Sequence, residues 1–143
     1  MDKDTLPIEL TATQAWQMLQ DNPRAVMVDV RSSMEFMFVG HPVGATHIAW
    51  IEEPDWTINP NFVKEVRKLL LGGVVCDGME GCAPVILICR SGMRSRDAGR
   101  ALSEAGLGNV YSVAFGFEGE LDEQHHRSTL NGWRFEGLPW AQC

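Results

Sequence analysis

This chain contains the stretch Pro84-Val85-Ile86-Leu87-Ile88-Cys89-Arg90-Ser91-Gly92-Met93-Arg94-Ser95, in which an apolar run ends in a cysteine and a short polar loop follows. A helical pattern begins after this loop, so the sequence predicts that Cys89 lies between a strand and the start of a helix. Backbone N–H groups and the helix dipole favour an anion at such a position. Because the thiolate is the nucleophilic form of cysteine, the pattern predicts a cysteine-dependent enzyme.

Strand and helix signals alternate regularly along the rest of the chain. Apolar runs predict strands at residues 8–10, 25–30, 45–51, 84–88 and 110–114. Helices are predicted after an N-cap at Thr11, over 33–38, over 61–71, and from the Cys89 loop to Gly106. This succession is typical of an α/β domain with a central, mainly parallel five-stranded sheet flanked by helices. Ligands of such sheets bind beyond the carboxyl ends of the strands, where Cys89 is expected.

Length and composition are those of one ordinary globular domain, and we expect a single domain over residues 1–143. The chain is 45% hydrophobic, with no apolar run long enough to cross a membrane. A net charge of -7 argues against a nucleic-acid partner. The start, Met1-Asp2-Lys3-Asp4-Thr5, lacks the features of a secretory signal, so we expect a cytoplasmic protein. Its four irregularly spaced cysteines do not indicate a disulfide scaffold.

Basic residues gather around Cys89. Four of the twelve, Arg90, Arg94, Arg96 and Arg100, fall within eleven positions, opposed there only by Asp97. Arg96 and Arg100 are interpreted as charges on a solvated helix face. Arg90 and Arg94 adjoin the thiol, and a guanidinium holds an oxyanion in a bidentate manner, so we interpret these two as anion-binding groups.

Several separate blocks of this sequence resemble the rhodanese family of sulfurtransferases. They are Asp29-Val30-Arg31 with Glu35, the turn Gly40-His41-Pro42-Val43-Gly44-Ala45, the loop Cys89-Arg90-Ser91-Gly92-Met93-Arg94, and the closing Gly116-Phe117 and Gly137-Leu138-Pro139. The turn departs from the family's Gly-His-Ile-Pro-Gly-Ala. The stretch 118–133 is longer than the family's usual ending, which leaves the rim of the site open to an added segment.

The resemblance implies a rhodanese-like three-layer fold and a sulfur-transfer reaction. Cys89 would take a sulfane sulfur from a donor such as thiosulfate, become a persulfide, and pass the outer sulfur to a thiol, a sulfur-carrier protein or another nucleophile. The expected substrate-binding cradle is formed by Arg90, Ser91, Gly92, Met93, Arg94 and Ser95. No cofactor, metal, nucleic acid or membrane is implied.

Other functions remain as alternatives. A dual-specificity phosphatase or arsenate reductase uses a related loop of the form Cys-x5-Arg, whereas here Arg94 stands five positions after Cys89 and Ser95 stands six. A non-enzymatic docking domain is a second alternative, although many such domains lack the cysteine. Redox sensing is a third, with Cys76 or Cys82 as the resolving partner.

The remaining cysteines, histidines and aromatic residues give weaker signals. The spacing of Cys76, Cys82, His125, His126 and Cys143 fits no recognised zinc site. His41, His47, His125 and His126 are interpreted as structural or solvent-exposed, because an already ionised thiol needs no general base. Trp133, Phe135 and Trp140 are interpreted as core or capping aromatics.

Overall fold

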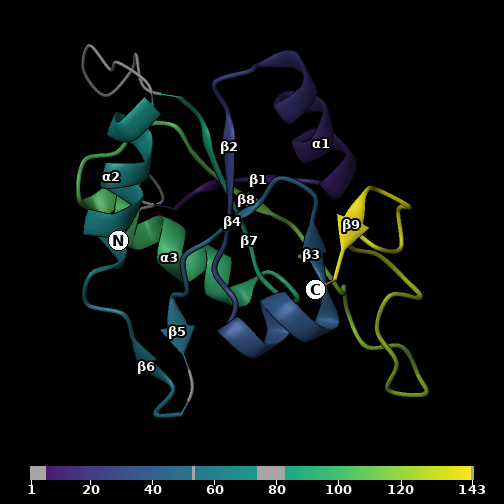
Figure 1. The fold of residues 1–143 in the computed structure, drawn as a ribbon. Helices are drawn as coiled ribbons and strands as arrows, with labels where there is room; N and C mark the ends of the chain where they lie inside the picture. The colour runs from purple at the N-terminus through teal and green to yellow at the C-terminus, as the bar shows by residue number, and fades with distance from the viewer. Residues whose placement is uncertain (1–5, 53, 74–82, 143) are drawn as a thin grey trace.

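A computed structural model describes residues 6–52, 54–73 and 83–142 of the chain (Figure 1). Its elements in chain order are β1 (Ile8–Leu10), α1 (Ala12–Asp21), β2 (Val26–Asp29), the π-helical turn η2 (Glu35–Val39), β3 (His41–Pro42), β4 (Thr46–His47), β5 (Ile51–Glu52), β6 (Thr57–Ile58), α2 (Phe62–Gly73), β7 (Val85–Ile88), α3 (Met93–Glu104), β8 (Val110–Val113) and β9 (Trp140–Ala141).

The main sheet has five strands in the order β1-β8-β7-β2-β4, and every neighbouring pair is parallel. β7 lies at its centre, paired with β2 through Met27 and Ile86 and with β8 through Leu87 and Ser112. The predicted α/β fold with a parallel five-stranded sheet is confirmed. Cys89 therefore leaves the middle of the sheet at its carboxyl edge.

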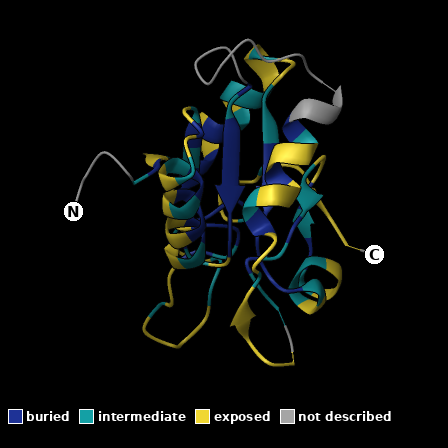
Figure 2. Ribbon diagram, turned by 90° about the vertical axis from the view of Figure 1, so that its left-hand side faces the viewer, coloured by how far each residue is buried: buried dark blue, intermediate teal, exposed yellow. Residues whose placement is uncertain are grey.

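Alternate residues of the central strands face two separate hydrophobic layers. Val85 and Leu87 pack with the apolar faces of α2 and α3. Ile86 and Ile88 point to the opposite face, where Ala12 and Ala15 of α1 lie. Figure 2 shows the result as buried strands between helices whose outer sides are exposed. This period-two alternation gives strands that are covered on both faces, which explains their almost continuous apolar sequences.

The N-terminus of α1 has the predicted capping box. The Thr11 side chain accepts a hydrogen bond from the Gln14 N–H at 3.1 Å, and the Gln14 side chain accepts one from the Thr11 N–H at 2.9 Å. Two of the unpaired amides at the helix start are thereby satisfied.

The single strand predicted over 45–51 is wrong, because the chain divides there into two strands. β4 belongs to the main sheet, and the amides of Ile48 and Trp50 continue its ladder by donating to the carbonyls of Asp29 and Val30. The chain then turns away, and β5 pairs antiparallel with β6 in a separate hairpin. Continuous apolar sequence could not show this change of pairing partner.

Two helix boundaries also differ from the sequence prediction. The helix predicted over 33–38 is mostly the wide turn η2, which continues to Val39 before Gly40 ends it at φ 114°. α2 continues through the predicted stop at Gly72 and Gly73. The rest of the loop predicted over 72–83 lies mainly outside the described residues. None of the described helices is long and apolar enough to cross a membrane.

The stretch 118–133 consists of turns that are connected by hydrogen bonds within the segment. The Ser128 N–H and the Arg127 guanidinium donate to the carbonyls of Glu118 and Gly119, and the Asn131 side chain accepts from the Glu120 N–H. Trp133 then enters the core on the α1 side of the sheet, as predicted, whereas Phe135 and Trp140 are exposed and do not belong to the core. The chain ends in β9, which pairs antiparallel with β3, a pairing that the sequence did not predict.

Candidate active site

Cys89 lies at the floor of a loop formed by residues 89–95, called here the Cys89 loop. Its Sγ accepts hydrogen bonds from the backbone N–H of Gly92 at 3.1 Å and from that of Ser95 at 3.3 Å. Both amides belong to the start of α3, whose first turn has no carbonyl partner of its own. Gly92 has φ 114°, a left-handed conformation that lets the backbone curl around the sulfur. The geometry favours negative charge on Sγ.

Further amides of the loop are left for a ligand. Within residues 6–52, 54–73 and 83–142, the N–H groups of Ser91, Met93 and Arg94 have no hydrogen-bond acceptor. These N–H groups are therefore available to an anionic ligand. Of the expected cradle of residues 90–95, the amides of Gly92 and Ser95 contact the sulfur, and substrate binding by the cradle stays a prediction. The backbone amides of residues 91–95 are called the amide ring below.

A buried hydroxyl pair lies behind the sulfur. Ser95 Oγ is 3.4 Å from Cys89 Sγ and 2.7 Å from Ser112 Oγ of β8. Ser112 was not singled out from the sequence. The only available signal was a polar residue inside the apolar strand signal at 110–114.

The segment that follows β8 fixes the shape of the Cys89 loop. Phe117 N–H donates to the Cys89 carbonyl at 2.7 Å, and Glu118 N–H donates to the Arg90 carbonyl at 2.9 Å. A Cβ on Gly116 would stand 2.3 Å from the Cys89 carbonyl oxygen, so no other residue fits that close approach. These contacts bind the carbonyls of Cys89 and Arg90 on the side of the segment after β8, while the amides of Gly92 and Ser95 donate to Sγ. Gly116 and Phe117 were noted in the sequence only as part of a resemblance.

Glu35 and Arg94 form an ion pair beside the Cys89 loop. The guanidinium contacts both carboxylate oxygens, at 2.7 and 2.9 Å. Burial would raise the pKa of Glu35, but the hydrogen bond and charge of Arg94, with help from Ser32 and Arg31, lower that pKa to about 2. The hydrogen bond to Glu35 likewise raises the pKa of Arg94 against the effect of burial, and the nearby Cys89 charge adds to the rise.

The ion pair with Glu35 reduces the capacity of Arg94 to bind an anion, which is the role expected from the sequence. Two of the five N–H donors of its guanidinium are used by Glu35, whose carboxylate also offsets the positive charge of Arg94. Arg90 is exposed, and within the described part of the chain its guanidinium has no hydrogen bond or ion pair. Arg96 lies 3.5 Å from Glu9 with both side chains half exposed, and Arg100 is exposed, as expected of a solvated face. Arg90 is therefore the guanidinium best placed to meet a dissolved anion.

A second, fully buried ion pair lies under the same edge of the sheet. The Arg31 guanidinium binds the Asp29 carboxylate through contacts of 2.9 and 2.7 Å, and it also donates to the Gly40 carbonyl. Its remaining nitrogen, Nη1, has no hydrogen-bond partner, but the guanidinium carbon lies 4.6 Å from the centroid of the Phe117 ring. Arg31 thus joins β2 to the residue that holds the Cys89 carbonyl.

Access to the sulfur is narrow, because Cys89 exposes only 1% of its surface. A persulfide bond of about 2.05 Å would carry the outer sulfur toward the unpaired amides. The buried thiol is therefore compatible with transfer of one atom and unsuited to bulky substrates that must surround it.

Two of the four histidines, His41 and His47, are within hydrogen-bond distance of backbone carbonyls outside the Cys89 loop. His41 Nδ1 lies 2.8 Å from the Phe36 carbonyl, and His47 Nε2 lies 2.7 Å from the Arg31 carbonyl. No group of three or more His, Cys, Asp or Glu side chains that could hold a metal occurs among the described residues. Cys76, Cys82 and Cys143 lie outside the described residues, so the suggested resolving and metal-binding roles of these cysteines are not addressed.

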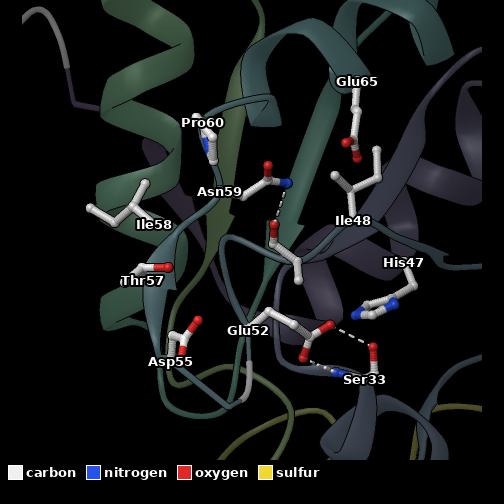
Figure 3. A pocket seen from close by; sticks show the side chains of 11 residues that line it. Ser33, His47, Ile48, Glu52, Asp55, Thr57, Ile58, Asn59, Pro60 and Glu65 are labelled. Atoms are coloured by element: carbon white, nitrogen blue, oxygen red, sulfur yellow. Dashed lines mark hydrogen bonds between the residues drawn. The ribbon is translucent and has the colours of Figure 1, made fainter.

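A cavity of about 440 Å³ opens beside β4 and the β5–β6 hairpin (Figure 3). Its lining includes His47, Glu52, Asp55 and Glu65, and Glu52 accepts hydrogen bonds from the amide and hydroxyl of Ser33. Neither Cys89 nor any residue of the loop 90–95 lines this cavity. The amide ring and the cavity are therefore separate features of the carboxyl edge.

Comparison with known proteins places this geometry in a family. The model of the rhodanese-like domain matches residues 11–122. The chain belongs to that family. The match covers four of the five strands of the main sheet, the Cys89 loop and the residues that bind its carbonyls; β1 lies before it, and it ends within the loop 118–133.

Related proteins cover most of the chain. The thiosulfate sulfurtransferase GlpE of Glaesserella parasuis is 35% identical over 111 residues, which is 78% of this chain and 83% of that protein. An uncharacterized protein of Rickettsia conorii is 29% identical over 133 residues, 92% of this chain and 94% of that protein. Among solved structures, Rv0390 from M. tuberculosis is similar with a TM-score of 0.79 and 42% identity, covering 94% of this chain and 97% of the other.

Proposed function

We propose that this rhodanese-like protein is a sulfurtransferase that carries sulfane sulfur as a persulfide on Cys89. The observation that supports this proposal is the donation of two backbone amides, those of Gly92 and Ser95, to Sγ at 3.1 and 3.3 Å. Relatives named thiosulfate sulfurtransferase support the reaction class. A working free thiol suits a reducing compartment, and we propose the cytoplasm.

In the first step the Cys89 thiolate attacks the outer sulfur of the donor. With thiosulfate, the S–S bond of the donor breaks, sulfite leaves with the bonding electron pair, and the new S–S bond makes Cys89-S-S⁻. The total charge of three negative units is the same on both sides. The terminal sulfur carries the charge to the amides of Ser91, Met93 and Arg94, so its anion is stabilised without any proton transfer.

In the second step an acceptor thiolate attacks that terminal sulfur. The bond between the two sulfurs on Cys89 breaks, the Cys89 thiolate is regenerated, and the acceptor leaves as a persulfide. Both the donor and the acceptor must present a slender sulfur terminus, because Cys89 is almost fully enclosed. A low-molecular-weight thiol and an extended thiol-bearing segment of a carrier protein both meet this requirement.

Mass spectrometry of the intact protein tests the proposal. After incubation with thiosulfate and removal of the excess, we expect the protein to gain the mass of one sulfur atom, located on the Cys89 peptide and removable by cyanide or a thiol. Cys89→Ser should gain none. Cys76, Cys82 and Cys143 serve as internal controls, because the peptide map reports all four cysteines. Sulfur retained by Cys89→Ser would place the reaction elsewhere.

The phosphatase alternative is tested with the same two proteins. Ser95 stands where such an enzyme has its phosphate-binding arginine, and the neighbouring Arg94 is bound at both oxygens of Glu35. We therefore expect no Cys89-dependent hydrolysis of an aryl phosphate. Hydrolysis that disappears in Cys89→Ser would contradict the sulfurtransferase assignment.

A further inference from the structure

The hydroxyls of Ser95 and Ser112 form a chain that ends at Cys89 Sγ. Ser95 Oγ has three neighbours: Sγ at 3.4 Å, the Gly92 carbonyl at 3.2 Å and Ser112 Oγ at 2.7 Å. Ser95 and Ser112 are 0% and 1% exposed, so neither hydroxyl lies in contact with bulk solvent. Because each of these hydroxyls has a single proton, the positions of the two protons determine which hydrogen bonds the buried pair forms.

Among the described residues, Ser95 Oγ is the only acceptor for the Ser112 hydroxyl proton. Within the described residues, the Ser112 hydroxyl has no hydrogen-bond partner other than Ser95 Oγ. If Ser95 donated to Ser112, the Ser112 proton would be buried without an acceptor, which is costly. Ser112 therefore donates to Ser95, and the single proton of Ser95 remains free for either the Gly92 carbonyl or the sulfur.

We propose that Ser112 is a positioning residue that makes the Ser95 hydroxyl a donor to the anionic sulfur of Cys89. When Cys89 is a thiol, its S–H donates to Ser95 Oγ and the Ser95 O–H donates to the Gly92 carbonyl. When Cys89 loses its proton, the Ser95 O–H turns to Sγ. The Gly92 carbonyl is not left unpaired, because it still accepts from the Arg96 N–H at 3.3 Å.

In the ionised state Sγ then has three donors, namely the amides of Gly92 and Ser95 and the Ser95 hydroxyl. Ser112 strengthens the last of these, because a hydroxyl that accepts a hydrogen bond becomes a better donor. The proposal rests on Cys89 being the reactive group of the proposed sulfurtransferase, but it concerns the ionisation of that thiol and not the identity of its substrates.

Titration of the Cys89 thiolate tests the role of Ser112. Thiolate absorbance is followed against pH, and the curve of the matching Cys89→Ser protein is subtracted to remove the other cysteines. In Ser112→Ala we expect the midpoint to rise by roughly half to one pH unit, the size of one weakened hydrogen bond to a charged group. Ser112→Thr keeps the hydroxyl and should restore the midpoint to that of the parent.

Val110→Ala is the matched control for loss of packing. Val110 lies on the same strand and the same face of the sheet as Ser112, and it is buried against the α3 layer. Its midpoint should equal that of the parent even if its stability falls. An unchanged midpoint in Ser112→Ala, or an equal shift in Val110→Ala, would overturn the proposal.

The test is separate from the test of sulfur transfer. A midpoint shift in Ser112→Ala supports the hydroxyl chain even if thiosulfate leaves no sulfur on Cys89, which would overturn only the proposed donor chemistry. A parent protein that forms the persulfide while Ser112→Ala titrates identically keeps the sulfurtransferase and overturns the role of Ser112.

Discussion

Arg94 and Glu35 are joined by two hydrogen bonds, of 2.7 and 2.9 Å, across 59 residues of sequence. The pair links η2 to the first turn of α3, next to the amides that surround Sγ. Arg94 therefore connects the start of α3 to η2, in addition to placing a positive charge near Cys89.

This ion pair predicts an acid-sensitive contribution to stability. The pKa of Glu35 lies below its ordinary value, 4.5, at about 2, because Arg94 and its other partners outweigh burial. A depressed folded-state pKa stabilises the protein above the unfolded value, and the contribution is lost as pH falls from about 4.5 toward 2. After allowance for partial exposure, we expect about 1 to 3 kcal/mol.

Glu35→Gln isolates this contribution. Denaturant unfolding at a series of pH values should show the parent losing more stability than Glu35→Gln between pH 5 and 2 by that amount, about 1 to 3 kcal/mol. Parallel curves for the two proteins would show that the pair does not stabilise the fold.

Arg90→Ala should weaken the use of anionic donors without unfolding the protein. Arg90 is exposed and unpaired among the described residues, so we expect a stability change of about 0.5 kcal/mol or less. Its loss should lower kcat/KM for thiosulfate about tenfold, through KM, as expected for one charge-assisted contact. Steady-state kinetics with a sulfane-sulfur donor that carries no charge should show a much smaller change, and equal loss with both donors would contradict an electrostatic role.

Arg94→Ala should differ from Arg90→Ala in its effect on stability. Removing Arg94 leaves the Glu35 carboxylate partly buried without its main partner, which we expect to cost about 2 to 4 kcal/mol. The double variant Glu35→Gln/Arg94→Ala should recover part of this loss, because no unpaired charge remains. Thermal or denaturant unfolding of the single and double variants measures the coupling, and strictly additive losses would show that the pair is not energetically coupled.

Gly116→Ala should damage both fold and activity. Its Cβ would meet the Cys89 carbonyl oxygen at 2.3 Å and the Arg90 carbonyl at 2.7 Å, and its φ is +61°. We expect a loss of about 2 to 4 kcal/mol of stability and the loss of persulfide formation. Gly137→Ala is the control, because Gly137 has a similar φ of +77° but open space around it. Similar effects of the two substitutions would mean that backbone conformation matters and the close approach does not.

Asp29→Asn should be among the most destabilising single substitutions. Asp29 and Arg31 are both fully buried, and the change leaves the guanidinium without a counter-charge. Breaking such a pair costs about 3 to 5 kcal/mol. Glu9→Gln removes the exposed partner of Arg96 and should change stability by about 0.5 kcal/mol or less. Chemical unfolding of both variants makes the comparison, and a small effect of Asp29→Asn would show that the buried pair is replaceable.

The sheet and the position of Cys89 were predictable because their signals are local. Buried strands such as β7 are continuous apolar runs, and the end of such a run followed by a glycine-containing loop identifies the edge where a ligand binds. The strand pair β3–β9 and the hairpin β5–β6 were not predictable, since two-residue strands carry almost no sequence pattern and their partners are set by tertiary packing.

The chemical surroundings of Cys89 were predictable only in part. The amides of Gly92 and Ser95 follow from the position of the loop before a helix. Three other features come from segments that approach Cys89 only in the folded chain. They are Glu35, which pairs with Arg94, the Ser112 hydroxyl, and the segment at Gly116 and Phe117 that packs against the Cys89 carbonyl. A charge in the sequence gives no information on whether another residue already neutralises it, which is why the sequence assigns Arg94 to anion binding although the fold pairs it with Glu35.

The hydrogen bonds from Phe117 and Glu118 to the carbonyls of Cys89 and Arg90 also affect the order of events during synthesis. Cys89 emerges from the ribosome before the residues that bind its carbonyl. A nascent chain that ends after α3 contains the amides of Gly92 and Ser95 but lacks Phe117 and Glu118. The final geometry of the Cys89 loop therefore forms only after the downstream segment has emerged and folded against it.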